Sequence, residues 1–463
     1  MKDLTKGNEA KLIFQFAIPM LLGNLFQQLY QIVNSIIVGR FLGEKSLAAV
    51  GAAFPIIFTL IALVIGFGIG ASVVISQYFG AKDYEKVRRA SDTINISFFF
   101  AGIALSIIGI LCNGWIFELL QLPQELMHDA KLYLNIYLSG LVVMFGFNGT
   151  AAILRGIGDS KTPLYFLIIS VLINILLDLL FILVFKWGIA GAALSTVISQ
   201  IGAFATAIIY LNRNHQIIRF NLKLIHFDRL IFWQSIKIGL PTGIQQTFVA
   251  LGSMALMGIV NTYGTIVIAG YTAAMRIDQL ATLPAMNFSA ALSGFVGQNM
   301  GARKFARIKA GLRATFLMSA AFCIVISIIV TFWGDHIMAM FTTNPDVIKV
   351  GHKYLIIVSV FYVFFSTMFT LSGMLRGAGA TLIPMFITLF SLWLIRIPLA
   401  YFLSKHTSLG VDGIWWAIPS AWIMGTIGSY IYYKMGSWKN KAITPHIETE
   451  LLEEEIGESA IVS

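Results

Sequence analysis

Apolar segments of about twenty residues, separated by short polar ones, run through most of the sequence. A helix rises 1.5 Å per residue, so roughly twenty apolar residues cross the hydrocarbon core of a bilayer. We therefore predict an all-α polytopic membrane protein with about twelve transmembrane helices. The expected spans are 12–39, 47–79, 92–116, 130–154, 162–185, 189–211, 233–262, 267–299, 308–333, 347–375, 381–403 and 412–434.

The composition agrees with this pattern. Charged residues make up 12% of the chain and apolar residues 57%, whereas a soluble domain carries roughly 25% charge. The formal net charge of +10 does not indicate nucleic-acid binding, because the basic residues lie in the short segments between the spans. Cys112 and Cys323 both lie in apolar segments, so the sequence predicts neither a disulfide framework nor a metal site built on cysteine.

Lysine and arginine are unevenly divided between the two sides of the predicted membrane. With the N-terminus placed in the cytoplasm, 23 of the 32 fall on the inner side and seven on the outer side. The positive-inside rule then predicts a multi-pass protein of the cell (inner) membrane with both termini in the cytoplasm. Segment 437–463, which is polar and then acidic, is predicted to be a disordered cytoplasmic tail.

The second half of the chain repeats landmarks of the first. Ser76–Lys82 returns as Gly297–Arg303, and Leu154–Gly158 returns as Leu375–Gly379, both 221 residues later. Because separate motifs share one offset, we infer the duplication of a six-helix unit. An even number of spans per unit makes the repeats parallel, related by a pseudo-two-fold axis along the membrane normal. The expected lobes are residues 1–225 and 226–436.

Amides line one face of the first predicted helix. Asn24, Gln27, Gln28, Gln31 and Asn34 are separated by three and four residues, which places them on one side of the helix. Amides facing lipid would lack partners, so this face meets protein or water. Contacts between helices also use amides, but five amides are more than such contacts require. We therefore expect a substrate cavity here. The candidate cavity residues are Gln27, Gln28 and Gln31, with Gln245, Gln246, Met257 and Met286 from the second half; plain packing explains the methionines equally well.

Asp178 lies in the middle of the fifth predicted span. An acid at the bilayer centre costs about 2.5–3.5 kcal/mol, so it must pair, protonate or bind a cation. Asn174 lies one helical turn earlier, and the next span offers Ser195, Thr196 and Ser199. Oxygen ligands suit a hard cation such as Na⁺, and the same carboxylate can carry a proton instead. A structural, hydrogen-bonded carboxyl group is the alternative interpretation.

Two charged residues lie within spans of the second half. Asp278 is near the start of the eighth span and Arg396 is in the eleventh. We predict that they form a structural ion pair between helices, because a paired acid is less free to titrate.

The sequence shows no motif of an enzyme or an ATPase. Gly66–Gly70 resembles a dinucleotide loop, but it lies in an apolar helix with no strand before it, so close helix packing or a flexible point is the better interpretation. Gly158–Thr162 lacks the glycine spacing of a phosphate-binding loop, and the histidines form no ligand cluster. We expect no enzymatic activity, no cofactor, no ATP and therefore secondary transport.

Several short segments are characteristic in combination: Ile18-Pro19, Gln27–Tyr30, Val38–Arg40, Leu47–Gly51, Gly80–Lys82, Gly301–Arg303 and the two Leu-Arg-Gly motifs. Together they resemble the MATE (multidrug and toxic compound extrusion) transporters, and the likeness covers roughly residues 10–435. The chain is most similar to the bacterial and archaeal branch related to the DNA-damage-inducible MATE proteins.

The resemblance implies two six-helix bundles that form a V, and antiport of H⁺ or Na⁺ against small cationic or amphiphilic compounds. It also implies a cation site in the N-terminal lobe, where the family's fifth-helix Asn and Asp match Asn174 and Asp178 and its sixth-helix Thr matches Thr196. Many members carry an Asp in the first helix where this chain has Asn34. Asn34 is therefore a candidate coupling residue, but a site with two carboxylates is not expected.

We accordingly expect a monomeric efflux transporter, exporting small organic compounds in exchange for H⁺ or Na⁺. The alternative is a flippase for a lipid-linked precursor, which would need a basic lumen. A membrane-embedded enzyme is a third and weaker alternative, because the spans contain no constellation of catalytic residues.

Overall fold

The computed structural model describes residues 2–215, 217–219 and 226–444, and the described part is helical throughout. The first half contains α1 (Glu9–Gly80), α2 (Tyr84–Leu119), α3 (Gln124–Ser139), α4 (Leu141–Gly156), α5 (Lys161–Leu179), the π-helical turn η1 (Leu180–Val184) and α6 (Gly188–Asn214). The second half contains α7 (Arg229–Val260), η3 (Asn261–Tyr263), α8 (Thr265–Gly301), α9 (Phe305–Ala339), α10 (Pro345–Ser359), α11 (Tyr362–Gly377), α12 (Leu382–Leu389), η4 (Phe390–Arg396), α13 (Ile397–His406), α14 (Val411–Met435) and η5 (Ser437–Lys441).

These helices make twelve membrane crossings. In the described part, eight helices are long and apolar enough to span a bilayer, and the bent pairs α3–α4 (48°) and α10–α11 (53°) add two spans. The 72-residue α1 contains two crossings, because its backbone breaks at Gly43. The 25-residue α14 is less apolar but reaches roughly 37 Å at 1.5 Å per residue. Every predicted span therefore coincides with a helix or a bent pair.

The backbone itself repeats with the offset found in the sequence. Gly43 has φ 85° and ψ 177° at the break in α1, and Gly264, 221 residues later, has φ 87° and ψ 172° before α8. Gly158 and Gly379 follow α4 and α11 with φ of 82° and 88°. Positive φ is the conformation that glycine adopts without strain, so the two halves conserve their turns as well as their helices.

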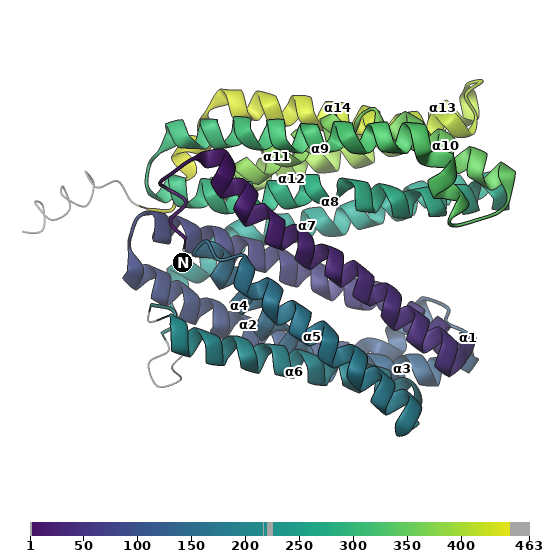
Figure 1. Cartoon of the computed structure of the whole chain (residues 1–463), viewed down its shortest axis with the longest axis horizontal. Helices are drawn as coiled ribbons and strands as arrows, with labels where there is room; N and C mark the ends of the chain where they lie inside the picture. Colours follow the sequence, from purple (N-terminus) through teal and green to yellow (C-terminus); the bar gives the residue numbers. More distant parts are fainter. Residues whose placement is uncertain (1, 216, 220–225, 445–463) are drawn as a thin grey trace, which may run out of the picture.

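The helices form two bundles that converge at the end where the N-terminus lies and diverge at the other end (Figure 1). One core cluster joins residues of α1 to α7, and a second joins residues of α7 to α14. A third cluster packs Leu4, Ile13 and Phe16 against Phe288 of α8 and Trp438 of η5. The start of the chain therefore crosses over and packs against the second bundle.

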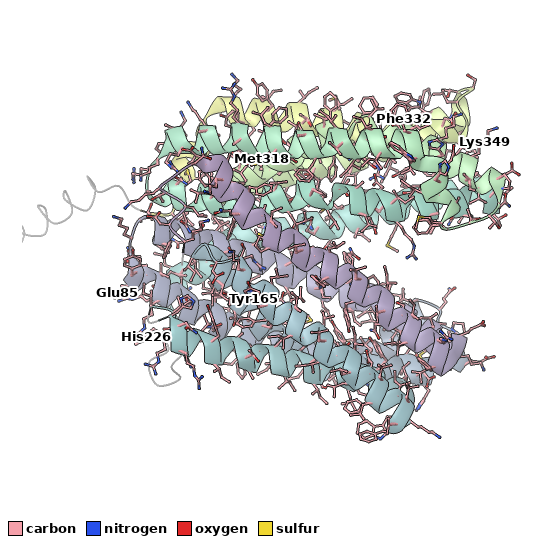
Figure 2. All side chains as sticks on the ribbon, viewed as in Figure 1. Glu85, Tyr165, His226, Met318, Phe332 and Lys349 are labelled. Atoms are coloured by element: carbon pink, nitrogen blue, oxygen red, sulfur yellow. The ribbon has the colours of Figure 1, made fainter. Side chains whose placement is uncertain are left out.

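Large apolar side chains cover the flanks of both bundles, as expected of surfaces that face lipid (Figure 2). Phe332 of α9 is 73% exposed and Tyr165 of α5 is 59% exposed. Charged side chains gather at the ends instead: Glu85 and His226 are labelled at the converging end and Lys349 at the diverging end (Figure 2). This distribution fits a membrane normal that runs along the bundles.

The prediction of a disordered tail from residue 437 was wrong for its first residues. Residues 437–441 form η5, and Trp438 is buried with its indole N–H donating to the Tyr433 carbonyl at 3.1 Å. The aromatic ring gains a buried apolar environment against Phe305 and Tyr433, which composition alone does not reveal. Residues 445–463 of the predicted tail lie outside the described residues.

Glycines allow the two bundles to touch backbone to backbone at the converging end. A Cβ on Gly66 would lie 2.5 Å from Gly243 Cα, and one on Gly70 would lie 2.3 Å from the Ser235 carbonyl oxygen. The predicted role of Gly66–Gly70 in close helix packing is therefore confirmed, because only small residues permit such an approach. We call this contact region between the bundles the seam.

Two equivalent glutamines bond across the seam. Gln77 Nε2 donates to the Gly377 carbonyl at 3.0 Å, and Gln298 Nε2 donates to the Gly156 carbonyl at 3.3 Å. Both side chains are fully buried. Their oxygens accept backbone N–H groups from the two ends of the described chain: Leu4 to Gln298 and Ile443 to Gln77, each at 2.8 Å. The seam is thus closed by a reciprocal pair of bridges that includes both terminal segments.

Replacing both glutamines, Gln77→Ala with Gln298→Ala, should loosen the seam. The change removes four buried hydrogen bonds, each worth about 1 kcal/mol. We expect the melting temperature in detergent to fall by several degrees and amide hydrogen exchange in 70–82 and 293–305 to accelerate. The control is Gln279→Ala, at an exposed position of α8. Unchanged exchange in the double variant would contradict a closing role for the pair.

Candidate functional site

Asp178 lies near the end of α5, inside the first bundle, and its side chain is fully buried. Its Oδ1 accepts a hydrogen bond from the hydroxyl of Ser195 on α6. Its Oδ2 is buried and has no hydrogen-bond partner among the described residues. The carboxylate is therefore half satisfied, and no basic residue forms an ion pair with it within 4 Å in the described part of the chain.

The structure brings Asn174 and Thr196 to the same place as Asp178. Asn174 is 2% exposed, and its Nδ2 donates to the hydroxyls of Ser195 and Thr196, both at 3.4 Å. Its Oδ1 is buried without a partner in the described structure. Ser195 links the amide to the acid, so the predicted residues form one connected group between α5 and α6.

Asn34 lies on α1, four residues after Tyr30. Its Oδ1 is also buried and lacks a hydrogen-bond partner in the described residues. Tyr30, one turn earlier on the same helix, has its hydroxyl beside Thr196 and lies close enough to Asp178 to act on it electrostatically. Because residues four apart share a helix face, Tyr30 orients this side of α1 toward the acid.

Two tyrosines of this site were missed by the sequence reasoning. Tyr30 falls within the amide stripe and could have been found there as a further polar residue. Tyr133 of α3 is buried behind the acid, and its ring stacks on Tyr137 at 6.4 Å. No pattern in the sequence connects Tyr133 to α5, because α3 and α5 come together only when the bundle packs.

The unpartnered oxygens define what the site can do. Asn34 Oδ1, Asn174 Oδ1 and Asp178 Oδ2 are all acceptors, and buried acceptors without partners are rare because each loses its hydration. A proton on Asp178 would remove the charge, and a small hard cation would satisfy several of the oxygens together. Among the described residues, no three His, Cys, Asp or Glu side chains gather into a metal-binding group, so a transition-metal site is not indicated there.

The amide stripe of α1 runs from the seam toward the diverging end. Asn24 Nδ2 donates to Asn287 Oδ1 of α8 at 2.8 Å, across the two bundles. Gln27 and Gln31 are exposed and Gln28 is half-buried. The apolar residues Leu29 and Ile32 occupy a different side of the same helix and are about half exposed, as on a lipid-facing surface. The amides therefore belong to the side of α1 that faces away from lipid.

The cavity candidates of the second bundle have partners of their own. Gln245 Nε2 donates to Thr388 Oγ1 of α12 at 2.6 Å, and Gln246 is half-buried. Met257 and Met286 pack against the core of the second bundle. This packing explains the two methionines without a role in binding.

The predicted ion pair of Asp278 with Arg396 was wrong. Among the described residues no ion pair joins them within 4 Å; Asp278 Oδ1 instead accepts from the Tyr362 hydroxyl at 2.8 Å. Arg396 ends the π-helical turn η4, and its Nε is buried without a hydrogen-bond partner in the described structure. The sequence places both charges within spans but carries no signal for which side chain of a neighbouring helix meets Asp278, and here that side chain is Tyr362.

The geometry can be compared with known proteins. The MatE family model matches residues 19–180 and 241–402, one stretch in each half. The chain is 32% identical over 441 residues to the "Probable multidrug resistance protein YpnP" of Bacillus subtilis (strain 168), covering 94% of this chain and 97% of that protein. It is 26% identical over 416 residues to the "Multidrug export protein MepA" of Staphylococcus aureus (strain MSSA476), covering 88% and 90%.

Solved structures show the same fold. The chain matches a structure described as "Outward-facing conformation of a multidrug resistance MATE family transporter of the MOP superfamily" with a TM-score of 0.89 at 24% identity, covering 95% of this chain and 99% of that one. A second structure, "Crystal structure of MATE in the bent conformation", also matches with a TM-score of 0.89 at 25% identity, covering 95% of this chain and 98% of that one. These matches confirm the predicted architecture of twelve helices in two bundles. The family model and the relative that is 32% identical confirm a transporter rather than an enzyme. The chain therefore belongs to the MATE (MatE) family of multidrug efflux transporters.

Proposed function

We propose that the protein exports small cationic or amphiphilic organic compounds across the cell membrane in exchange for H⁺ or Na⁺, and that Asp178 carries the exchanged ion. The observation that supports this most is the pair of buried, unpartnered oxygens, Asp178 Oδ2 and Asn174 Oδ1. A site that only stabilised the fold would satisfy both, as Asp278 is satisfied by Tyr362. The flippase alternative finds no support in the related proteins.

The coupling step follows from where the site lies. Ion entry at Asp178 changes the charge beside Tyr30 and Asn34, and these residues belong to the helix that bears Gln27 and Gln31. A ligand shifts an equilibrium between two states only through a difference in its affinity for them. In our proposal the loaded site favours the state with low affinity for the compound, so the compound leaves on the outer side as the ion moves inward.

The proposed orientation places the seam at the cytoplasmic face. The positive-inside rule puts both termini there, and the terminal segments lie at the seam through Leu4 and Ile443. The bundles diverge at the opposite end (Figure 1), so the state described is open toward the outside. Alternating access then requires the bridges of Gln77 and Gln298 to break.

The variant Asp178→Asn tests the coupling site. It keeps the size of the side chain but removes the charge that an ion must neutralise, so efflux of ethidium driven by a pH or Na⁺ gradient should fall at least tenfold in proteoliposomes. Running the two gradients separately identifies the ion. Binding of ethidium without a gradient should persist, which shows that the variant is folded.

The matched control is Asp278→Asn, which removes the half-buried acid of the second bundle. Because that carboxylate already accepts from Tyr362, we expect gradient-driven efflux to remain within about twofold of the unmodified protein. Undiminished efflux by Asp178→Asn, or equal losses in both variants, would contradict coupling at Asp178.

Replacing the two exposed amides of α1, Gln27→Leu with Gln31→Leu, tests the substrate face. Loss of one or two hydrogen bonds of about 1 kcal/mol each should weaken ethidium binding roughly five- to thirtyfold, as measured by fluorescence anisotropy. Gln279→Leu, on the exposed surface of α8, is the control and should bind normally. Equal affinities in all three proteins would remove α1 from the binding surface.

A further inference from the structure

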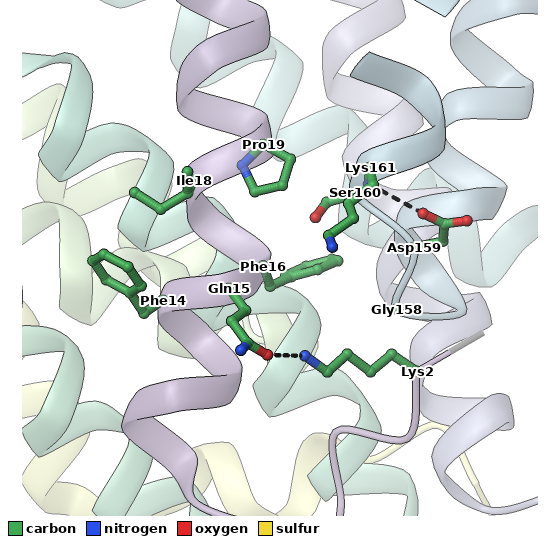
Figure 3. A pocket seen from close by; sticks show the side chains of 10 residues that line it. All are labelled: Lys2, Phe14, Gln15, Phe16, Ile18, Pro19, Gly158, Asp159, Ser160 and Lys161. Atoms are coloured by element: carbon green, nitrogen blue, oxygen red, sulfur yellow. Dashed lines mark hydrogen bonds between the residues drawn. The ribbon is translucent and has the colours of Figure 1, made fainter. Parts of the chain in front are cut away.

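A pocket of about 600 Å³ lies at the converging end, outside the site of Asp178 (Figure 3). Its walls are the first residues of the chain, the start of α1 and the loop between α4 and α5. The polar lining includes Lys2, Gln15, Ser160 and Lys161. Nothing in the proposed transport cycle uses these side chains.

Two lysines give the pocket a positive charge. Figure 3 shows the side chains of Lys2 and Lys161 both directed toward the α1 segment that carries Gln15 and Phe16. Lys2 Nζ donates to Gln15 Oε1 at 2.5 Å, a neutral acceptor. Burial, together with repulsion from Lys161 and Lys11, lowers the pKa of Lys2, which shows that like charges are gathered here.

The acid in the lining does not neutralise these lysines. Asp159 Oδ1 accepts from the backbone N–H groups of Lys161 at 3.1 Å and Thr162 at 3.0 Å. Its Oδ2 accepts from the Thr162 hydroxyl at 2.6 Å. The carboxylate thus caps the start of α5. Neither Lys2 nor Lys161 has an ion pair within 4 Å in the part of the chain that the structure describes. With Asp159 counted against Lys2 and Lys161, the lining keeps a net formal charge of +1.

The remaining wall is apolar and continues along α1. Phe14 is 41% exposed, and Ile18 and Pro19 complete this side of the pocket. α1 enters the membrane near this point, because the first predicted span begins at residue 12. A cationic end next to an apolar strip at the membrane surface matches a molecule with an anionic head and hydrocarbon chains.

We propose that this pocket binds the headgroup of an anionic phospholipid of the surrounding bilayer, with its phosphate between Lys2 and Lys161 and its chains along Phe14, Ile18 and Pro19. Such a lipid would connect the N-terminal segment to the start of α5. Lys2 N also donates to the Ile157 carbonyl at 3.2 Å, and Leu4 N donates to Gln298. The lipid therefore stabilises the closed seam and links membrane composition to the opening of the inner side. This inference does not depend on the identity of the transported compound.

Lipid binding is measured on the purified full chain by native mass spectrometry and by the melting temperature in detergent. The probes are dioleoylphosphatidylglycerol, dioleoylphosphatidylcholine and inorganic phosphate. The tested variant is Lys2→Gln with Lys161→Gln. Its control is Lys82→Gln with Lys309→Gln, which removes the same charge from exposed positions at the same end of the bundles.

We expect the unmodified protein and the control to bind phosphatidylglycerol about tenfold or more tightly than the tested variant does, since each lysine near a membrane surface contributes about 1 kcal/mol to anionic lipid binding. Lys2→Arg with Lys161→Arg should restore binding, which separates charge from misfolding. Equal phosphatidylglycerol affinity in the tested variant and the control overturns the proposal. So does phosphatidylcholine binding as tight as that of phosphatidylglycerol, or stabilisation by inorganic phosphate equal to that by the lipid.

Discussion

Inside a bilayer no water is available to hydrogen-bond a polar atom, and each unsatisfied group costs several kcal/mol. The whole structure follows this constraint. The described backbone is helical throughout the crossings, and buried hydroxyls such as those of Ser91 and Thr315 return hydrogen bonds to carbonyls one turn earlier. Where a buried acceptor lacks a partner, as at Asp178 Oδ2 and Asn174 Oδ1, it has lost its hydration, and a bound proton or cation would offset that cost.

Asp178 and Asp278, the acids within the two bundles, differ in whether their oxygens have hydrogen-bond partners. Asp278 is held by Tyr362 within a group of aromatic residues, where Tyr271 stacks on Trp415 at 5.3 Å. Asp178 has one oxygen bonded to Ser195 and the other without a partner, next to an equally unpartnered oxygen of Asn174. An aspartate therefore forms a structural hydrogen bond in one bundle and keeps an unpartnered acceptor oxygen in the other. This asymmetry supports assigning ion exchange to the first bundle.

The seam links that site to the rest of the molecule. α1 carries Asn24, which bonds across the two bundles, and Tyr30, which lies beside Thr196 at the ion site, so one helix connects the closed end, the amide stripe and the ion site. Its N-terminal residues pack on the second bundle, and Lys2 lines the basic pocket. A change at any of these places acts on the same rigid element, which is the physical basis for coupling among them.

The sequence by itself determined the features that depend on local pattern. Span length and hydropathy gave the twelve crossings, the 221-residue offset gave the duplicated plan, and helical spacing gave the shared face of Asn174 and Asp178. Those features follow from the rise per residue of a helix, from its period and from the apolar solvent around it, all of which can be evaluated for one helix at a time. Helix-to-helix contacts were decided only by the tertiary structure: the partner of Asp278, the burial of Trp438, the approach of Tyr30 and Tyr133 to the acid, and the basic pocket around Lys2. Each depends on how helices and terminal segments pack against one another, and such packing leaves no periodic signal in the chain.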